Sequence, residues 1–313
     1  MRVFTTQQTG KGYMLRDLGF LLKNCRFHLM APYINAFVVS FGFLSTSKLS
    51  NLLSIDTALV FLFSVLHTGS IYSLNNVYDV EADKRQVSVD KGYGRWNLSA
   101  KNQIALGNIS KKKAAAFSVI LFCFSALFFY LKGGLLPAFL ATAIFVWAWA
   151  YSAPPLKFKN RFVLDLVLHG LFWGSFLFLM GYFMNKSVDP LLSAVPSVVL
   201  IFLSSVLWEL HNYFEDYYAD KEAGNLTSVV RLGLKRSFYV YLFVLGTAIA
   251  YSLFLAQAMW PTIAFLGAMV LYLVSGLVVA KRDSLKTMFL PRKHFYMANL
   301  LIFAWMAGSL YFR

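Results

Sequence analysis

Two groups of side chains in this sequence have the composition of a metal-binding site. Each group has one asparagine and two aspartates at intervals of four residues: Asn75, Asp79 and Asp83 in the first, and Asn212, Asp216 and Asp220 in the second. On a helix this spacing places the three side chains on one face. Mg²⁺ prefers oxygen ligands and is usually held by one or two carboxylates together with substrate phosphates. We therefore interpret these groups, called the first and second Asn-Asp-Asp sets below, as two halves of one magnesium–diphosphate site.

Each set also has a simpler interpretation. Lys84 and Arg85 follow the first set directly, and carboxylates with basic neighbours at a helix end often form only a solvated cap. That alternative explains either set alone. Acidic side chains at the border of a membrane are costly and usually mark a bound ion or substrate. The repetition of the pattern favours the metal site, in which the asparagines supply neutral oxygen ligands.

A basic segment follows a pair of prolines. Tyr151-Ser152-Ala153-Pro154-Pro155 ends an apolar run, and Lys157, Lys159 and Arg161 come next. Paired prolines end a helix and stiffen the turn after it. The segment predicts a cationic wall for phosphate oxygens. The alternative is a positively charged loop that only anchors the chain at the cytoplasmic side of a membrane.

The composition predicts an integral membrane protein. The chain has 313 residues, of which 58% are hydrophobic, and a mean hydropathy of +0.60, so a water-soluble domain would lack polar surface. The net charge of +15 is compatible with nucleic acid or with anionic lipid. The basic residues lie between the apolar runs, which favours lipid and argues against nucleic acid. Cys25 and Cys123 form no disulfide framework, and no signal peptide is visible.

The apolar runs predict an all-α polytopic bundle of nine transmembrane helices. Each run is about long enough to cross the hydrocarbon layer: Phe27–Ser45, Ile55–Tyr78, Ala114–Leu131, Leu135–Tyr151, Phe162–Met184, Leu191–His211, Phe238–Gln257, Pro261–Ala280 and Phe295–Phe312. Residues 27–313 then form a single domain. The preceding tail, residues 1–26, contains an amphipathic stretch from Tyr13 to Asn24 that suits an interfacial helix.

The basic residues also predict the orientation. All but four of the 29 lysines and arginines lie in the N-terminal tail or in the loops after the even-numbered runs. The four exceptions are Lys48, Lys132, Lys186 and Arg313. The positive-inside rule therefore predicts that the N-terminus and both Asn-Asp-Asp sets are cytoplasmic.

Aromatic and histidine side chains near the two sets are weaker signals. A cationic substrate group would need π-faces around it. Aromatic candidates on the same or adjacent runs are Phe61, Phe63, Tyr72, Tyr78, Trp147, Trp149, Tyr151, Trp208 and Tyr213. Membrane helices are rich in such residues in any case. His67 suits a packing role better than that of a general base, and His211 could support the second set. No histidine pair has the spacing of a zinc site.

In their order and positions, these motifs resemble those of the UbiA superfamily of intramembrane prenyltransferases, such as 4-hydroxybenzoate polyprenyltransferases. The matching segments are Asn75-xxx-Asp79-xxx-Asp83, Tyr151-Ser152-Ala153-Pro154-Pro155 with Lys157, and Asp216-xxx-Asp220-xxx-Gly224-xx-Thr227 running on to Arg231-Leu232-Gly233. The resemblance implies a nine-helix bundle with a central cavity and a cytoplasmic cap. It also implies Mg²⁺-dependent transfer of a prenyl group from a polyprenyl diphosphate to an acceptor, and our hypothesis is that this acceptor is aromatic or a quinone precursor.

The resemblance further implies roles for individual residues. Both Asn-Asp-Asp sets would bind Mg²⁺-diphosphate, Lys157 would contact the phosphates, and Tyr151 would line the cavity near them. Lys159 and Arg161 of the basic segment, Tyr78 beside the first set and Arg95 are further candidates for substrate binding. Oligomeric state, prenyl length and acceptor do not follow from the sequence.

One departure from the family pattern lies after the first set. Gln103-Ile104 occupies the place where family members commonly have Arg-Pro, and the inserted stretch 87–100 contains Arg95, a candidate for the missing charge. This divergence keeps two other enzyme outcomes open: a terpene cyclase on the same scaffold, and transfer to a non-aromatic acceptor. A transporter is disfavoured, because the sets lie at the ends of apolar runs and not at broken helices near the bilayer midplane.

Overall fold

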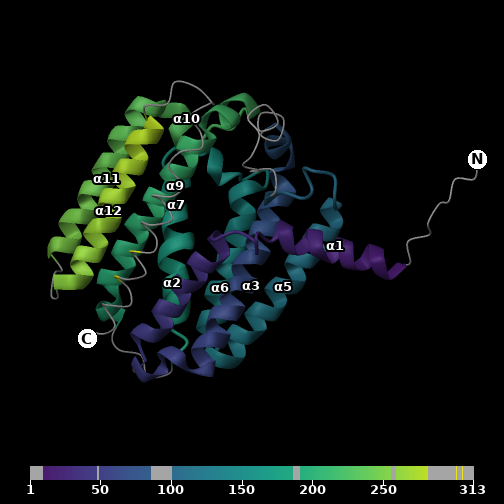
Figure 1. Cartoon of the computed structure of the whole chain (residues 1–313), viewed down its shortest axis with the longest axis horizontal. Helices are drawn as coiled ribbons and strands as arrows, with labels where there is room; N and C mark the ends of the chain where they lie inside the picture. The colour runs from purple at the N-terminus through teal and green to yellow at the C-terminus, as the bar shows by residue number, and fades with distance from the viewer. Residues whose placement is uncertain are drawn as a thin grey trace, which may run out of the picture.

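In the described part of the structure, a computed structural model, every regular element is a helix (Figure 1). It covers residues 10–47, 49–85, 101–185, 191–254 and 259–280, with residues 301 and 305. The α-helices are α1 (Gly10–Asn24), α2 (Ala31–Ser45), α3 (Ile55–Tyr78), α5 (Lys111–Gly133), α6 (Leu135–Ser152), α7 (Leu164–His169), α8 (Phe176–Tyr182), α9 (Val195–Ala223), α10 (Ser228–Leu232), α11 (Leu234–Phe254) and α12 (Met259–Ala280). Short 3-10 helices are η1 (Leu49–Leu53), η3 (Phe158–Asn160) and η5 (Leu191–Ala194), and η4 (Gly170–Ser175) is a π-helix between α7 and α8.

Within the described residues, six helical stretches are long and apolar enough to cross a membrane, and they indicate an integral membrane protein. They are Ile55–Tyr78, Lys111–Gly133, Leu135–Ser152, Leu164–Tyr182, Leu192–Ala223 and Ser228–Phe254. α2 and α12 coincide with two more of the predicted runs. The ninth predicted run, Phe295–Phe312, lies almost wholly outside the described residues, so the count of nine crossings stays a prediction.

The first apolar run begins its helix later than its hydropathy suggests. The run was predicted from Phe27, but α2 begins at Ala31, with Pro32 in its first turn. Arg26 has a left-handed φ of 61°, and the chain turns there between α1 and α2. Proline suits the first turn of a helix because its missing N–H would have no partner there. The turn leaves α1 running across the direction of α3 and α5 (Figure 1).

Small residues allow the helices of the bundle to approach closely. A Cβ atom added at Gly181 of α8 would lie 1.8 Å from the carbonyl oxygen of Val39 on α2, and one added at Gly42 would lie 2.0 Å from that of Phe178. Backbone-to-backbone packing of this kind is how membrane helices associate without a hydrophobic driving force between them. α2 and α8 are thereby fixed to each other. At one edge of the molecule α11 and α12 lie side by side (Figure 1).

The two Asn-Asp-Asp sets lie at helix ends, as predicted, but with different backbones. α3 ends at Tyr78 and Asp79 is its C-cap, after which residues 80–85 are helical again. The amide of Asp79 still bonds to the carbonyl of Asn75 at 3.0 Å, and that of Asp83 to the carbonyl of Asp79 at 2.9 Å. The four-residue register therefore survives the break. α9 carries the second set without interruption.

Candidate functional site

The two Asn-Asp-Asp sets meet in one cavity. A space of about 310 Å³ lies between the ends of α3 and α9 and the loop that follows α6. All six members of the two sets line it. Tyr151 from the end of α6 and Lys159 from η3 line it as well. Residues from distant parts of the chain thus share one chamber.

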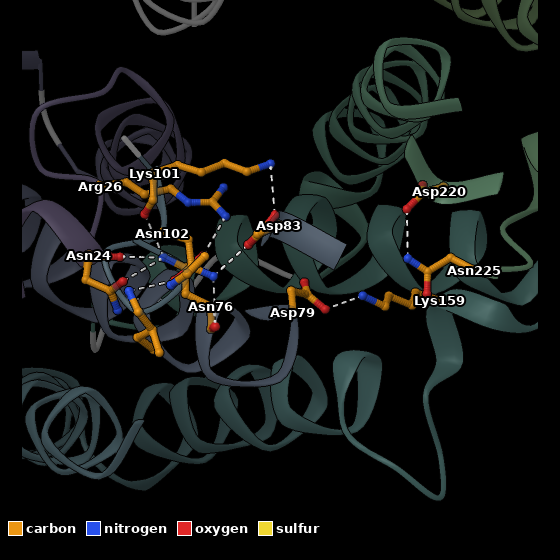
Figure 2. Close-up of polar contacts among 12 residues, drawn as sticks. Asn24, Arg26, Asn76, Asp79, Asp83, Lys101, Asn102, Lys159, Asp220 and Asn225 are labelled. Atoms are coloured by element: carbon orange, nitrogen blue, oxygen red, sulfur yellow. Dashed lines mark hydrogen bonds and ion pairs between the residues drawn. The ribbon is translucent and has the colours of Figure 1, made fainter. Parts of the chain in front are cut away.

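Cations and amides hold the carboxylates of the first set (Figure 2). Lys159 forms an ion pair with Asp79, and both side chains are largely buried. Lys101 Nζ lies 3.7 Å from Asp83 Oδ1. Asn102 Nδ2 donates to Asp83 Oδ2 at 2.7 Å. Each carboxylate therefore has a defined orientation at the cavity wall.

The second set is fixed from the loop beyond its own helix. Gly224 ends α9 with a left-handed φ of 73°, a conformation that glycine adopts without strain. The turn brings Asn225 back onto the helix, where its Nδ2 donates to Asp220 Oδ1 at 2.8 Å (Figure 2). Lys157 Nζ donates to Asn225 Oδ1 at 3.0 Å. Asn225 thus connects the second set to the basic segment.

The donor atoms at this site fit Mg²⁺. The Oδ1 atom of Asn75 is buried at the cavity wall and makes no hydrogen bond among the described residues, as expected of an oxygen that serves an ion. The described residues contain no group of three acidic, histidine or cysteine side chains close enough to chelate an ion. Mg²⁺ tolerates this because it keeps several waters and binds substrate phosphates together with one or two carboxylates.

The structure separates the three cations of the basic segment. Lys159 is buried and lines the cavity. Lys157 lies behind Asn225 and is not among the cavity-lining residues. Arg161 is exposed; its Nε donates to the carbonyl of Leu156 and its guanidinium lies 5.6 Å from the ring centre of Phe158. A role for Lys157 or Arg161 at the phosphates therefore stays a prediction.

The two lysines differ in their electrostatics. Burial lowers the pKa of Lys159, but the negative charges of Asp79, Asp220 and Asp83 outweigh this effect and raise it above its usual value. Burial lowers the pKa of Lys157, and the neighbouring charge of Lys159 lowers it further. Lys159 is therefore the stronger fixed positive charge at the cavity.

Other predicted residues lie at varying distances from the cavity. Tyr78 is half-exposed, accepts a hydrogen bond from Trp149 Nε1 at 2.9 Å and does not line the cavity. Arg95 falls in 86–100, outside the described residues. Of the aromatic candidates, four line the cavity: Tyr72, Tyr151, Trp208 and Tyr213. The others pack elsewhere, as Phe63 does by stacking on Phe128 with ring centres 4.1 Å apart.

The structure shows a hydrogen-bonded cluster around Glu209 in the cavity, which we did not predict from the sequence. Glu209 Oε1 accepts from the Tyr151 hydroxyl at 2.7 Å, and Glu209 Oε2 lies 3.2 Å from His169 Nε2. The Tyr151 hydroxyl also bonds to that of Tyr213. The one signal in the sequence was position: Glu209 precedes Asn212 by three residues and so shares its helical face. Nothing in the sequence indicated that His169 would lie beside it.

A stack of rings continues the wall from this cluster. Trp173 stacks on Tyr72 with ring centres 5.2 Å apart and 18° between the planes. The guanidinium of Arg26 lies 4.5 Å from the ring centre of Tyr72 on α3. His169 and Trp173 flank the first half of η4, and single π-helical turns within α-helices often occur at functional sites. The inner cavity therefore combines π-faces with one buried carboxylate.

The divergent stretch after the first set has a defined structural role. Lys101 and Asn102 contact Asp83, as described above, and the backbone amide of Gln103 bonds to Asn24 Oδ1 at 3.0 Å. Asn76 Nδ2 donates to the carbonyl oxygens of Asn24 and Lys101 at 2.9 and 2.8 Å. Within the described residues, Lys101 thus supplies positive charge beside the first set, a role the sequence assigned to Arg95.

Comparison of the sequence with known proteins identifies the family of the chain. The sequence profile of the UbiA prenyltransferase family matches residues 35–307. Among relatives, a lycopene elongase/hydratase from Haloarcula japonica is 28% identical over 76% of this chain and 72% of its own length. A digeranylgeranylglyceryl phosphate synthase from Saccharolobus solfataricus is also 28% identical, over 70% of each chain.

Solved structures show the same fold. A UbiA homologue from Archaeoglobus fulgidus bound to GPP and Mg²⁺ superposes with a TM-score of 0.68 at 17% identity, over 93% of this chain and 99% of its own. An apo UbiA homologue from Aeropyrum pernix K1 gives a TM-score of 0.64 at 14% identity, over 90% and 96% of the two chains. The profile covers most of the sequence, and the helical fold agrees with it. The chain belongs to the UbiA prenyltransferase family and is a membrane-embedded transferase.

Proposed function

We propose that this protein transfers a prenyl group from an isoprenoid diphosphate to an aromatic or quinone-precursor acceptor within the membrane, in a reaction that requires Mg²⁺. One observation carries the proposal: both Asn-Asp-Asp sets and Lys159 line the same cavity, whose inner wall is aromatic. The solved UbiA homologues bound to GPP and to DMAPP, each with Mg²⁺, support the same donor class.

The two Asn-Asp-Asp sets are the residues that would hold the metal. Bound Mg²⁺ would neutralise the diphosphate and stabilise the charge that develops on it as it leaves. Lys159 adds a fixed positive charge beside Asp79. Since its pKa is raised, it stays protonated throughout the physiological range. Hydrogen-bond donors that are already oriented before the reaction would also favour catalysis, because they need not reorganise as charge develops.

Other residues of the cavity would contact the allylic part of the prenyl diphosphate as it separates from the leaving diphosphate. Tyr72 and Trp173 line the cavity and stack on each other, and aromatic rings attract cationic centres. Exclusion of water from the inner cavity would protect a reactive cation from hydrolysis. Tyr151 Oη is fixed by Glu209 and Tyr213 and would border the reacting carbon. Lys157 positions the second set through Asn225.

The orientation and the domain boundaries belong to the same proposal. The positive-inside pattern places the N-terminus, the two sets and the basic segment on the cytoplasmic side. Residues 27–313 would form one nine-helix domain with a cytoplasmic cap, preceded by the tail 1–26, in which α1 is the proposed interfacial helix. Accessibility of cysteines introduced one at a time into the loops, measured in intact vesicles, tests this topology.

Purified protein in nanodiscs tests the activity. We would supply Mg²⁺ and prenyl diphosphates of increasing length, with and without phenolic and quinol acceptors, and identify the products by mass. Acceptor-dependent release of diphosphate with a prenylated adduct is the expected result. Transport alone would release no diphosphate, and this outcome would refute the enzyme assignment.

A second candidate is transfer to a non-aromatic acceptor. The observation in its favour is the pair of relatives, one a lycopene elongase/hydratase and one a digeranylgeranylglyceryl phosphate synthase. Adding lycopene and geranylgeranylglyceryl phosphate to the acceptor panel separates this candidate from the first. A cyclised terpene formed without any acceptor would instead indicate a cyclase on the same scaffold.

A further inference from the structure

On each of the two helices that carry an Asn-Asp-Asp set, one residue lies about one helical turn before the asparagine of the set. Tyr72 precedes Asn75 by three residues on α3, and Glu209 precedes Asn212 by three residues on α9. At 1.5 Å per residue, each lies about 5 Å deeper along its helix than the asparagine. Both line the cavity. A diphosphate held by the two sets would therefore place its first prenyl carbon near this layer, where the acceptor must also reach.

Glu209 is oriented in this layer by three hydrogen-bonding groups. The Tyr151 hydroxyl donates to Oε1 at 2.7 Å, Asn212 Nδ2 donates to Oε2 at 3.2 Å, and His169 Nε2 lies 3.2 Å from Oε2. His169 is itself held, because its Nδ1 lies 3.0 Å from the Ser205 hydroxyl oxygen. A carboxylate offers about four acceptor positions. One position on Oε1 is thus left for a further donor.

The packing behind this cluster is tight. A Cβ atom added at Gly170 would lie 2.6 Å from the ring of Phe202, and one added at Gly174 would lie 3.0 Å from the carbonyl oxygen of Ile201. η4 therefore lies directly against α9. His169, the last residue of α7, directly precedes η4, and its contact with Glu209 joins α7 to α9. The position of the carboxylate is therefore set by the packing of these helices.

The charge of the cavity disfavours an acidic acceptor in this layer. Among the described lining residues, six are aspartate or glutamate and three are lysine or arginine. Lys159 and Lys101 are paired with Asp79 and Asp83. Within the described part of the chain, no lysine or arginine forms an ion pair with Glu209. The third cation, Arg26, lies over the ring of Tyr72 and donates to Asn76 Oδ1. A carboxylate or phosphate placed beside Glu209 would therefore meet a like charge that no ion-paired lysine or arginine neutralises.

We propose that Glu209, held by Tyr151 and His169, is the specificity-determining residue for the acceptor, and that it selects an uncharged acceptor bearing a hydroxyl group. The hydroxyl donates to the remaining acceptor position of Glu209 while the Tyr72–Trp173 stack contacts the apolar body. Acceptors with a carboxylate at the same place are rejected by the charge of Glu209. This inference rests on the proposed function, since it assumes that a prenyl diphosphate occupies the neighbouring site.

The test uses a matched pair of acceptors. Hydroquinone and 4-hydroxybenzoate carry a hydroxyl and a carboxylate, respectively, at the same ring position. Protein in nanodiscs is first loaded with Mg²⁺ and the thiolo analogue of geranyl diphosphate, and binding of each acceptor is then measured by equilibrium dialysis. We expect the wild type to prefer hydroquinone by about tenfold or more. Glu209→Gln should reduce this preference to about threefold or less, because it removes the charge and keeps the shape.

Two further variants separate charge from geometry. Tyr151→Phe removes one donor to Glu209 but leaves its charge, so the preference for hydroquinone should persist. Glu81→Gln removes an exposed carboxylate outside the cavity and should leave the ratio unchanged.

The outcomes are distinct. If the thiolo analogue of geranyl diphosphate does not bind in the presence of Mg²⁺, the proposed function itself is wrong. Donor binding with equal affinity for the two acceptors, or with a preference for 4-hydroxybenzoate, would overturn this inference alone. Binding of neither acceptor would overturn it as well, since the wall would then not be an acceptor site. Should Glu209→Gln fail to fold, the wild-type ratio decides by itself.

Discussion

Lys159 of η3 forms a buried ion pair with Asp79, the residue at which α3 ends. The contact joins the basic segment after α6 to the first Asn-Asp-Asp set (Figure 2). Two motifs that are far apart in the sequence thereby become one site. Removing either partner leaves the other charge uncompensated, and this determines the first prediction.

Lys159→Ala should both destabilise the protein and reduce turnover. Breaking a buried ion pair by removing one partner costs about 3–5 kcal/mol, and we expect the lower end because the Asp79 side chain is 25% exposed. Thermal unfolding in detergent measures the loss. Lys132→Ala is the matched control, since it breaks the more exposed pair with Asp56 and should cost less than about 1 kcal/mol. Equal losses in the two variants would contradict the structural role of Lys159.

Asn102→Ala should weaken binding of the prenyl diphosphate, although Asn102 is not itself a predicted Mg²⁺ ligand. The Asn102 side chain donates to Asp83 and also accepts from the backbone amides of Ile104 and Ala105 at 3.0 and 3.1 Å. Its loss leaves those buried groups unpaired, at a cost of about 1–3 kcal/mol. We expect lower stability and a raised KM for the donor. Asn108→Ala is the control, because among the described residues the Asn108 side chain donates to Gln103 alone. A similar KM in both variants would count against the role given to Asn102.

The close approach of α2 and α8 predicts a large effect from one methyl group. Gly181→Ala would place its Cβ 1.8 Å from the Val39 carbonyl oxygen, so the helices must separate, at a cost of about 1–3 kcal/mol or more. Gly246→Ala on α11 meets no atom within 4 Å and should be neutral or slightly stabilising. Thermal unfolding of the two variants side by side provides the measurement. A harmless Gly181→Ala would show that the two helices are not packed as described.

The thiol of Cys25 should resist alkylation in the folded protein. Burial raises its pKa to about 12, against a smaller opposing effect of the hydrogen bond with Ser73. Because the folded pKa is raised, thiolate is scarce at all pH values below it, and at pH 8 about one molecule in 10⁴ carries it. In a Cys123→Ser background, iodoacetamide should label the protein only after denaturation. Rapid labelling of the native protein at pH 8 would contradict the buried placement of Cys25.

The sequence was sufficient to predict the helical membrane fold, the family and the convergence of the two sets. These features depend on hydropathy and on spacing, which are local properties of the chain. The break of α3 at Asp79 was not predictable, because the four-residue spacing continues through it. The division of labour within the basic segment also depends on tertiary packing: Lys159 turns into the cavity while Arg161 faces outward.

The inner cluster shows the same limit more clearly. Glu209 could have been noticed from its position before Asn212, but its partner His169 comes from another run. Their contact depends on the π-helix η4 and on the close packing of η4 against α9, neither of which has a periodic signature in the sequence. Likewise, the pairing of Lys101 and Asn102 with Asp83 follows from a loop path that hydropathy does not encode.

The central claim is that both Asn-Asp-Asp sets act on one magnesium-bound diphosphate. The most direct measurement is Mg²⁺-dependent binding of a prenyl thiolodiphosphate to the wild type, Asp79→Asn and Asp216→Asn, with thermal unfolding recorded for each. We expect Mg²⁺-dependent binding by the wild type and its loss, by about a hundredfold or more, in both variants while they remain folded. Chelation of Mg²⁺ should abolish binding by the wild type. Undiminished binding by either folded variant would contradict the claim that the two sets form a single site.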